Sequence, residues 1–364
     1  MKEIAVIGAG HIGSAIAELL QWSGDYRVTL CDRDGGALER VARETGVRTV
    51  VVDAGEPAEL ARVLRGQYAV LSAAPYHLTA RVAEAARLAG VHYLDLTEDV
   101  ASTRAVREIA RDAGHAFIAQ CGLAPGFVSI AAHAIAQRFE TLDAIRLRVG
   151  ALPRYPDNAL GYNLTWSTEG VINEYIEPCE AIVGGERCRV SALEDCESLL
   201  VDGVAYEAFN TSGGLGSLCE TYDGRVRELN YRTMRYPGHC AVMRLLLRDL
   251  RLADRRQILR VILEGALPAT TQDNVVVFVT VTGTRDGRLM QETMTRRVVH
   301  GSISGRPRSA IQLTTAGSIC AVLDLLAAGE LPQAGVVRQE QIRLETFLEN
   351  RFGSIFSGTP VRFA

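Results

Sequence analysis

The chain has 364 residues, of which 48% are hydrophobic and 23% are charged, and its formal net charge is -4. This length suggests two domains of ordinary size, and the composition is that of a soluble globular protein. The negative charge and the lack of a basic stripe argue against nucleic-acid binding, and no apolar run reaches the roughly 20 residues of a membrane span. Because the N-terminus shows no signal-peptide pattern, we expect a cytoplasmic protein.

Two residue counts narrow the chemistry further. The eight cysteines include no C-x-x-C pair, so neither a zinc site nor a disulfide framework is predicted. Lys2 is the single lysine, and every other residue among the 39 basic ones is arginine. A lysine that acts as general base or forms a Schiff base is therefore excluded.

The first element is a short apolar strand, Glu3–Gly8, which runs into the sequence GAGHIG and a helix at Ile12–Gln21. The order strand, G-x-G-x-x-G, helix is typical of a dinucleotide-binding domain. Its glycines permit a tight turn, close approach of the pyrophosphate and close helix packing, and the helix N-terminus faces the phosphates. The predicted cofactor contacts in this loop are Gly8, Gly10, His11, Ile12 and Gly13.

A carboxylate ends the second predicted strand, Arg27–Asp32, 19 residues after Gly13. At this position a carboxylate accepts hydrogen bonds from the adenosine ribose and repels a 2′-phosphate, so Asp32 favours NAD as the cofactor. Arg33 beside it keeps NADP open as an alternative.

Four more apolar strands follow, with helical segments between them. They are predicted at Thr49–Ala54, Tyr68–Pro75, His92–Thr97 and His115–Gly122. Six such strands predict a doubly wound parallel sheet of the Rossmann type, with its ligand at the carboxyl ends of the strands. Further cofactor contacts are therefore predicted at Asp53, Ser72, Ala73, Ala74 and Pro75.

The pattern changes after a Gly/Pro-rich turn at Gly122–Gly126, where a helix begins near Phe127. Beyond this helix the apolar period becomes two, which predicts a mostly antiparallel sheet in an α+β domain. A hairpin is expected through Thr284–Arg288, and a late apolar helix at Thr314–Ala328. We predict three segments: a Rossmann domain at 1–122, a substrate-binding and oligomerisation domain at 123–312, and a helix and tail at 313–364 that return toward the Rossmann domain.

The sequence NYRTMRYPGH offers a cation and a base near the end of a predicted strand. Arg235 could clamp a substrate carboxylate through two hydrogen bonds, or it could form an ordinary ion pair. Arg232 lies on the opposite pleat and is expected to be structural. His239 and Asp95, the latter at the carboxyl end of the fifth strand, are the two candidate general bases.

The sequence YNLTWSTEG gives candidate pocket walls. Tyr162 and Trp166 supply rigid rings, and Ser167 and Glu169 supply polar groups. Ser167 or Thr168 could equally cap a helix through Gly170–Tyr175. At the end of the sixth strand, Cys121 and Gly122 are expected to face the same substrate.

Together, GAGHIG, SAAPYHLT, YLDLTED, CGLAPGFVSI, YNLTWSTEGVINEYIEPCEAIV and NYRTMRYPGH resemble the lysine 6-dehydrogenases of the saccharopine dehydrogenase (reductase-type) superfamily. The resemblance covers nearly the whole chain. It implies NAD-dependent oxidative deamination of the ε-amino group of L-lysine to allysine. Allysine cyclises to Δ1-piperideine-6-carboxylate, and ammonia is released. It also implies a homodimer or higher homo-oligomer, with Arg235 on the α-carboxylate and an acid such as Glu169 or Asp95 facing the ammonium.

Two alternatives stay open at this point. A relative acting on a secondary amine, such as saccharopine or carboxynorspermidine, would need a second arginine, for which Arg232, Arg154 or Arg225 could serve. A non-catalytic NAD-binding protein on the same fold would bind nucleotide without turnover.

Overall fold

A computed structural model describes residues 1–358 and Phe363, and the chain forms two compact units. Unit 1 comprises Met1–Phe127, Gly301–Arg308 and Gln312–Ala364, and unit 2 comprises Val128–His300 and Ser309–Ile311. Within the predicted tail segment 313–364, residues 359–362 and 364 lie outside the described part of the chain.

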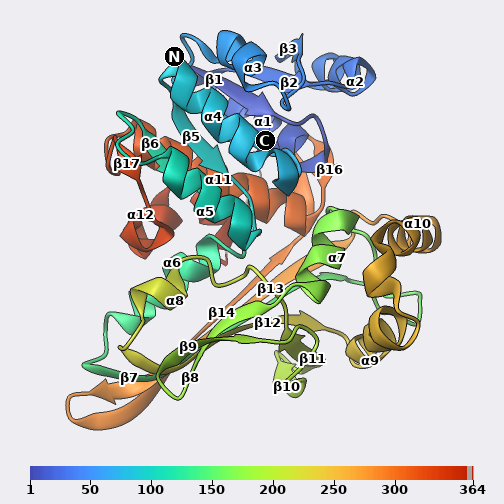
Figure 1. Cartoon of the computed structure of the whole chain (residues 1–364), viewed down its shortest axis with the longest axis vertical. Helices are drawn as coiled ribbons and strands as arrows, with labels where there is room; N and C mark the ends of the chain where they lie inside the picture. Colours follow the sequence, from blue (N-terminus) through green and yellow to red (C-terminus); the bar gives the residue numbers. More distant parts are fainter. Residues whose placement is uncertain (359–362, 364) are drawn as a thin grey trace. The chain divides into compact units, whose positions relative to one another are not determined.

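Unit 1 is built on a parallel sheet whose strand order is β17-β6-β5-β4-β1-β2-β3 (Figure 1). This order confirms the predicted doubly wound sheet. The chain runs from β1 through β2 to β3 at one edge, and it then returns to place β4 on the other side of β1. The strands are β1 (Lys2–Ile7), β2 (Tyr26–Asp32), β3 (Arg48–Val51), β4 (Ala69–Ser72), β5 (His92–Asp95), β6 (Ala116–Ile118) and β17 (Gly335–Val336).

Helices cover both faces of this sheet. They are α1 (His11–Ser23), α2 (Gly35–Thr45), α3 (Pro57–Leu64), α4 (Thr79–Ala89), α5 (Val100–Ile109), α11 (Ala310–Ala327) and α12 (Leu344–Glu349). Ala5 and Ile7 of β1 share one apolar cluster with residues of α3, α4 and α5, while the alternate residues Ile4 and Val6 are also fully buried. This burial of successive residues explains why the strand sequences are continuously apolar.

The strands of unit 1 are shorter than predicted at their carboxyl ends. β5 stops at Asp95, because the Asp95 side chain accepts a hydrogen bond from the Thr97 amide and turns the chain. β6 stops at Ile118, and Gln120 then takes a left-handed φ of 66°. The predictions that these strands reach Thr97 and Gly122 were therefore wrong. The two-residue strand β17 was missed, because two residues carry no periodic signal.

By length and composition, the 18-residue helix α11 could cross a membrane, but 83% of this helix is buried inside the structure. It begins at Ala310, four residues earlier than predicted, where Asp273 accepts hydrogen bonds from the Ala310 amide and from the Ile311 amide (3.1 Å). The burial of its residues identifies α11 as a core helix.

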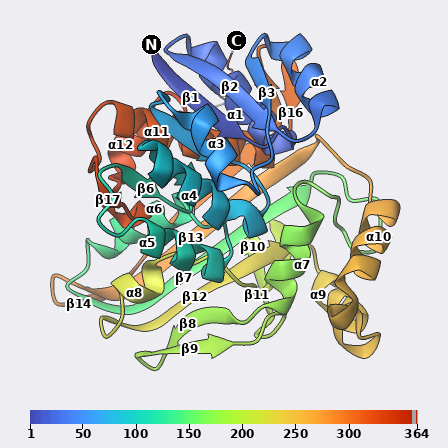
Figure 2. The same cartoon turned by 45° about the horizontal axis from the view of Figure 1, so that its top comes forward.

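Unit 2 holds an eight-stranded sheet with the order β10-β11-β12-β7-β13-β14, and β8 also pairs with β12 and β9 (Figure 2). All its pairs are antiparallel except β12 with β7, which confirms a mostly antiparallel sheet. The strands are β7 (Thr141–Pro153), β8 (Cys179–Val183), β9 (Glu186–Val190), β10 (Glu197–Val201), β11 (Val204–Asn210), β12 (Val226–Arg235), β13 (Asp273–Arg285) and β14 (Arg288–Val299).

The predicted hairpin between the last two long strands is present but tighter than expected. Thr284 and Arg285 belong to β13 and Arg288 begins β14, so the turn is Asp286–Gly287. Both turn residues have positive φ, 52° and 68°, as a two-residue type I′ hairpin turn requires.

One face of the unit 2 sheet is covered by an apolar cluster that includes Tyr175 of α7, Phe209 of β11, Met243 of α9 and Leu259 of α10. The helices of this unit are α6 (Phe127–Ala136, which starts at the end of unit 1), α7 (Thr168–Ile176), α8 (Leu218–Thr221), α9 (His239–Arg244) and α10 (Arg256–Ala266). A separate two-stranded hairpin in unit 1 consists of β15 (Gly301–Ile303) and β16 (Arg306–Arg308).

Candidate active site

The glycine loop of unit 1 leaves space where a pyrophosphate would bind. Gly8 has a φ of +102°, and a Cβ there would lie 2.8 Å from the Ala73 carbonyl oxygen. A Cβ on Gly13 would lie 1.8 Å from the Gly8 carbonyl oxygen, whereas a Cβ on Gly10 would meet nothing within 4 Å. Gly8 and Gly13 are thus needed for packing, and Gly10 borders open space at the N-terminus of α1. These residues fit a dinucleotide phosphate.

Asp32 holds the position that the sequence assigned to the ribose. It ends β2, and its Oδ2 accepts a hydrogen bond from the Ala9 amide (2.6 Å) while its Oδ1 accepts one from the Asp34 amide (2.9 Å). Each carboxylate oxygen keeps a further lone pair for a hydroxyl donor. Arg33 next to it is exposed, as is His11, and Ile12 is half-buried.

The other predicted cofactor residues lie at the carboxyl ends of neighbouring strands. Ser72 is buried at the end of β4, level with Ile7 of β1, and the Ala73 amide donates to the Ile7 carbonyl (2.8 Å). Ala74 is half-buried and Pro75 is exposed. Asp53 is exposed after β3 and accepts a hydrogen bond from the Gly55 amide (2.8 Å), which closes a local turn.

Asp95 is buried at the end of β5, level with Ser72. Its carboxylate accepts hydrogen bonds from the Gln120 amide (2.8 Å), the Tyr93 hydroxyl (2.8 Å) and the Thr97 amide (3.0 Å). Burial raises the pKa of Asp95 to about 6, although these three donors favour the charged form. The side chain therefore joins the loops after β5 and β6.

Cys121 and Gly122 lie in the loop after β6, in the same unit as Asp95. The Cys121 thiol is fully buried and contacts the Gln339 amide nitrogen (3.4 Å), and burial raises its pKa well above the ordinary value. Gly122 closes a tight turn, because its carbonyl accepts from the Phe127 amide (2.9 Å) and a Cβ on Gly126 would lie 1.9 Å from its oxygen.

Arg235, the last residue of β12 in unit 2, is a buried cation with aromatic neighbours. Its Nε donates to the Tyr175 hydroxyl (3.0 Å), and its Cζ lies 4.8 Å from the centre of the Tyr162 ring. In the described part of the chain no carboxylate oxygen lies within 4.0 Å of the guanidinium, although the Glu174 charge acts on it at longer range. Because burying a cation without an adjacent anion is costly, this arrangement is prepared for an anionic ligand.

A directional chain of hydrogen bonds connects Arg235 to His239. The His239 Nδ1 lies 2.9 Å from the Leu160 carbonyl, which can only accept, so Nδ1 carries the proton. Nε2 then accepts from the Tyr175 hydroxyl (3.0 Å), whose oxygen in turn accepts from Arg235. Burial and the Arg235 charge lower the pKa of His239 to about 3, so the ring is neutral near pH 7.

Glu207 of β11 fixes the turn that carries His239. Its carboxylate accepts hydrogen bonds from the Gly238 amide (2.9 Å) and the Cys240 amide (2.6 Å) at the start of α9. Gly238 takes a φ of 101° at this turn. The position of the imidazole is therefore set from both sides, by the backbone of its turn and by its two ring nitrogens.

The predicted aromatic walls differ in their placement. Tyr162 is 2% exposed and packs edge-on against His239 with ring centres 5.6 Å apart, so it belongs to the Arg235 group. Trp166 is half-buried and packs against the apolar cluster of unit 2. Ser167 is exposed, and its hydroxyl accepts from the Gly170 amide (3.1 Å), so it caps α7. Glu169 is half-buried, and its charge acts on Arg260 of α10.

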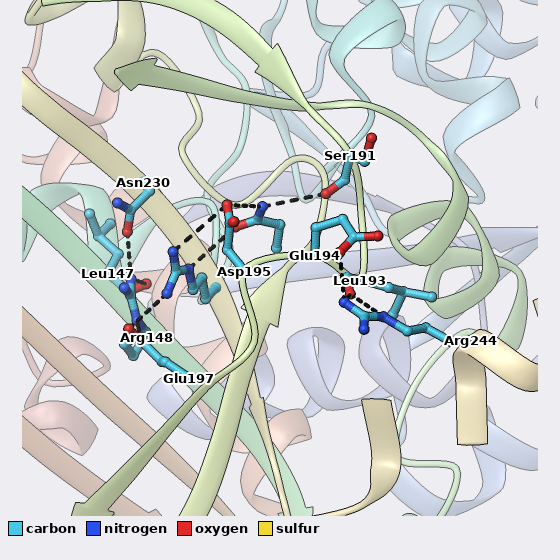
Figure 3. Close-up of polar contacts among 11 residues, drawn as sticks. Leu147, Arg148, Ser191, Leu193, Glu194, Asp195, Glu197, Asn230 and Arg244 are labelled. Atoms are coloured by element: carbon cyan, nitrogen blue, oxygen red, sulfur yellow. Dashed lines mark hydrogen bonds and ion pairs between the residues drawn. The ribbon is translucent and has the colours of Figure 1, made fainter. Parts of the chain in front are cut away.

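Arg232 faces the other side of the sheet, as its odd separation from Arg235 along a strand requires. It forms an ion pair with Glu197 (2.7 Å). The Glu197 carboxylate also binds Arg148, and Arg148 donates to the Asn230 side-chain oxygen (2.8 Å) (Figure 3). Nearby in the same view, Arg244 donates to the Leu193 carbonyl (2.7 Å). The ion pairs of Glu197 with Arg232 and Arg148 therefore lie on the face of the sheet opposite Arg235.

Tyr175 is the residue of this group that the sequence prediction left out. It is buried and links Arg235 with His239. Its position seven residues after Thr168 on α7 marks an inward face, but the pattern cannot distinguish a packing tyrosine from one that orders a polar chain.

Two family models match most of the chain. Residues 4–119 match the NADP-binding domain of saccharopine dehydrogenase, and residues 122–350 match the C-terminal domain of the same enzyme. The chain belongs to the saccharopine dehydrogenase family. Its N-terminal segment is therefore a dinucleotide-binding domain of this family.

Similar proteins share limited identity with the chain. The mitochondrial alpha-aminoadipic semialdehyde synthase of Rattus norvegicus is 24% identical over 197 residues, covering 52% of this chain and 21% of that protein. The NADP+, L-glutamate-forming saccharopine dehydrogenase of Saccharomyces cerevisiae is 24% identical over 186 residues, covering 47% of this chain and 40% of that enzyme. The chain thus matches less than half the length of these curated relatives.

The apo structure of saccharopine dehydrogenase (L-Glu forming) from Saccharomyces cerevisiae has the same fold. Its TM-score is 0.77 at 17% identity, with 96% of this chain and 97% of that chain covered. At this identity the likeness concerns the fold alone.

Proposed function

We propose that the protein catalyses the NAD-dependent oxidative deamination of the ε-amino group of L-lysine. The product is allysine, which cyclises to Δ1-piperideine-6-carboxylate, and ammonia is released. Unit 1 binds the dinucleotide, which supplies the hydride acceptor when bound, and unit 2 binds the carboxylate end of the amino acid.

The observation that carries this proposal is the buried guanidinium of Arg235, which has no carboxylate within 4.0 Å among the described residues. A planar guanidinium binds a carboxylate through two parallel hydrogen bonds. The Arg235 Nε is already engaged by Tyr175, and Nη1 donates to the Met234 carbonyl (2.9 Å). The remaining Nη2 and the outer proton of Nη1 therefore hold the α-carboxylate of the substrate.

We assign His239 and Asp95 to positioning rather than to proton transfer. His239 keeps Tyr175 and thereby Arg235 in place, since both its ring nitrogens are engaged. Asp95 holds together the loops after β5 and β6. Neither side chain has a free acceptor site comparable to that of an exposed base.

The cofactor is proposed to be NAD. Asp32 presents its carboxylate at the end of β2, beside the glycine loop, where a 2′-phosphate would meet a negative charge. We expect kcat/KM with NAD to exceed that with NADP by at least roughly tenfold, and Asp32→Ala to reduce this ratio. The matching family domain and the yeast relative are both named for NADP, and a protein that turns over NADP as efficiently as NAD would refute this assignment.

A secondary-amine substrate such as saccharopine is the first alternative, and the family name favours it. Saccharopine carries additional carboxylates, which call for a second arginine. Arg232 faces the other side of the sheet and binds Glu197 (2.7 Å), and Arg154 and Arg225 are exposed. These placements support the smaller substrate. A non-catalytic NAD-binding role is the more distant alternative. It does not explain why the Arg235 guanidinium is buried without an adjacent carboxylate.

Arg235→Gln is the variant that tests the carboxylate clamp. Losing a charge-assisted hydrogen-bond pair costs about 2–3 kcal/mol, so we expect KM for lysine to rise roughly 30- to 150-fold while the dissociation constant of NADH stays within about twofold. Arg232→Gln is the matched control, because it removes the same charge from the opposite face of β12. It should lower stability and leave KM for lysine unchanged. Equal losses of lysine and NADH affinity in Arg235→Gln would refute the clamp.

A further inference from the structure

The exposed cysteine Cys196 directly precedes β10, on the sheet face of unit 2 that carries Arg235. The next residue, Glu197, pairs with Ala208 of β11, and Glu207 of β11 pairs with Arg235 of β12. Because side chains alternate between the two faces along a strand, Cys196 lies on the face of Glu207 and Arg235. The exposed thiol therefore lies on the side of the sheet that holds the Arg235 group.

Cys240, the second residue of α9, is buried over the same face. Its amide donates to the Glu207 carboxylate (2.6 Å), and its thiol donates to the carbonyl of Leu193 (3.4 Å), three residues before Cys196. A side-chain hydrogen bond joins the Cys240 and Cys196 thiols, and the Glu207 charge acts on both. One exposed and one buried thiol thus form a contact pair within unit 2.

The loop between β9 and β10 holds Cys196 beside α9. The Arg244 Nε of α9 donates to the Leu193 carbonyl (2.7 Å), and its Nη2 donates to the Glu194 carboxylate (2.8 Å) (Figure 3). Leu193 and Asp195 take positive φ angles of 62° and 51°, which are costly for residues with side chains. Side-chain contacts with α9, rather than regular backbone pairing, therefore keep this loop in place.

We propose that Cys196 and Cys240 are a modification site, at which hydrogen peroxide joins the two sulfurs in a reversible disulfide. The Cys196 thiolate attacks one peroxide oxygen, the O–O bond breaks, and the departing hydroxide takes up the thiol proton to become water, which leaves a sulfenic acid. The Cys240 sulfur then attacks the Cys196 sulfur, the S–O bond breaks, and a second water leaves with the Cys240 proton. Two thiols lose two electrons, and one peroxide is reduced to two waters. A dithiol reductant reverses the bond by exchange.

The disulfide reaches the Arg235 group through His239, the neighbour of Cys240. The new bond draws the two sulfurs closer than their hydrogen bond does, and it removes the proton that Cys240 donates to the Leu193 carbonyl. The His239 Nε2 accepts from the Tyr175 hydroxyl, whose oxygen accepts from Arg235. A shift at the start of α9 therefore displaces the guanidinium. The effect on substrate binding rests on the proposed function.

Peptide mapping tests the disulfide itself. Wild type, Cys196→Ser and Cys188→Ser are treated with hydrogen peroxide, alkylated, and digested with trypsin and a glutamate-specific protease. Trypsin alone leaves Cys196 and Cys219 in one peptide, 190–225, whereas cleavage after the glutamates at 194 and 197 separates them. Because partial burial raises the pKa of the Cys196 thiol, the reaction is run at mildly alkaline pH.

We expect a linked peptide of Cys196 and Cys240 in the wild type, and its loss on treatment with dithiothreitol. Cys188→Ser is the matched control, because Cys188 is the other exposed cysteine in the described part of the chain, and this variant should form the same link. Cys196→Ser should keep the wild-type melting temperature and form no link. A wild type in which Cys240 stays unlinked, or in which Cys196 pairs with a second molecule, would overturn the proposal.

A kinetic test separates the disulfide from the proposed function. Oxidised wild type should show kcat/KM for lysine lowered roughly 5- to 100-fold with NADH affinity unchanged, because a small displacement of a positioning group costs up to about 10²-fold. Dithiothreitol should restore the wild type, and peroxide should not affect Cys196→Ser. If the link forms and lysine turnover is unchanged, the connection to the Arg235 group is refuted. If reduced wild type does not turn over lysine, the proposed function fails, and the peptide map still decides the disulfide.

Discussion

At the residue scale, the chemistry of unit 2 depends on how a single cation is buried. Arg235 could be predicted as a carboxylate clamp because an arginine follows an apolar strand and precedes a Pro-Gly turn. Whether it would form an ordinary ion pair could not be predicted, since the answer depends on which face of the sheet carries acids. The acid Glu197 lies on the Arg232 face, and Arg235 meets tyrosine rings instead.

His239 leads to a prediction at the same scale. Burial and Arg235 lower its pKa in the folded chain to about 3, below the ordinary value of 6.5. Between these values the unfolded chain binds a proton that the folded chain does not, so stability is complete above pH 6.5 and decreases as pH falls toward 3. From pH 7 to pH 5 this one group should reduce the free energy of unfolding by about 2 kcal/mol.

The measurement is urea unfolding of the wild type and of His239→Asn at both pH values. The asparagine variant should be less stable at pH 7 and should lose less stability between pH 7 and pH 5 than the wild type. His92, whose pKa is lowered to about 4 by burial, contributes in the same direction in both proteins and therefore cancels in the comparison. Parallel losses in the two proteins would show that His239 is not buried as a neutral ring.

Among the elements, the strands of unit 1 were predicted better at their starts than at their ends. β5 and β6 stop early because the side chain of Asp95 and the left-handed Gln120 redirect the chain, and neither effect has a periodic pattern. Capping is more readable: the sequence offered Ser167 or Thr168 as the cap of this helix, and Ser167 is the residue that caps α7.

Ser167 allows this reading to be tested, because the sequence left open whether it caps α7 or binds substrate. Its hydroxyl accepts from the Gly170 amide (3.1 Å), so Ser167→Ala should lower the free energy of unfolding by about 1 kcal/mol. KM for lysine should stay within about twofold, because the cap does not face the Arg235 group. Ser167→Asp, which preserves a capping acceptor, should recover the stability. A large rise in KM in Ser167→Ala without loss of stability would show that Ser167 contributes to substrate binding and not to capping.

At the scale of the whole molecule, the doubly wound sheet and the mostly antiparallel sheet were both predictable. Continuous apolar strands separated by helices indicate the first, and alternation indicates the second. The sequence predicted that 313–364 returns toward the Rossmann domain, but it placed Gly301–Arg308 in the second domain, whereas this segment also belongs to unit 1. Long-range contacts such as that of the Tyr68 hydroxyl with the Leu326 carbonyl (3.3 Å) secure this return, and local patterns do not encode them.

The proposed function depends on which nitrogen of the substrate leaves as ammonia. The direct measurement supplies NAD with L-lysine labelled with 15N either at the ε-position or at the α-position, and follows NADH and 15N-ammonium together. We predict one 15N-ammonium for each NADH from the ε-labelled substrate and none from the α-labelled one. Labelled ammonium from the α-position, or NADH formed from saccharopine but not from lysine, would contradict it.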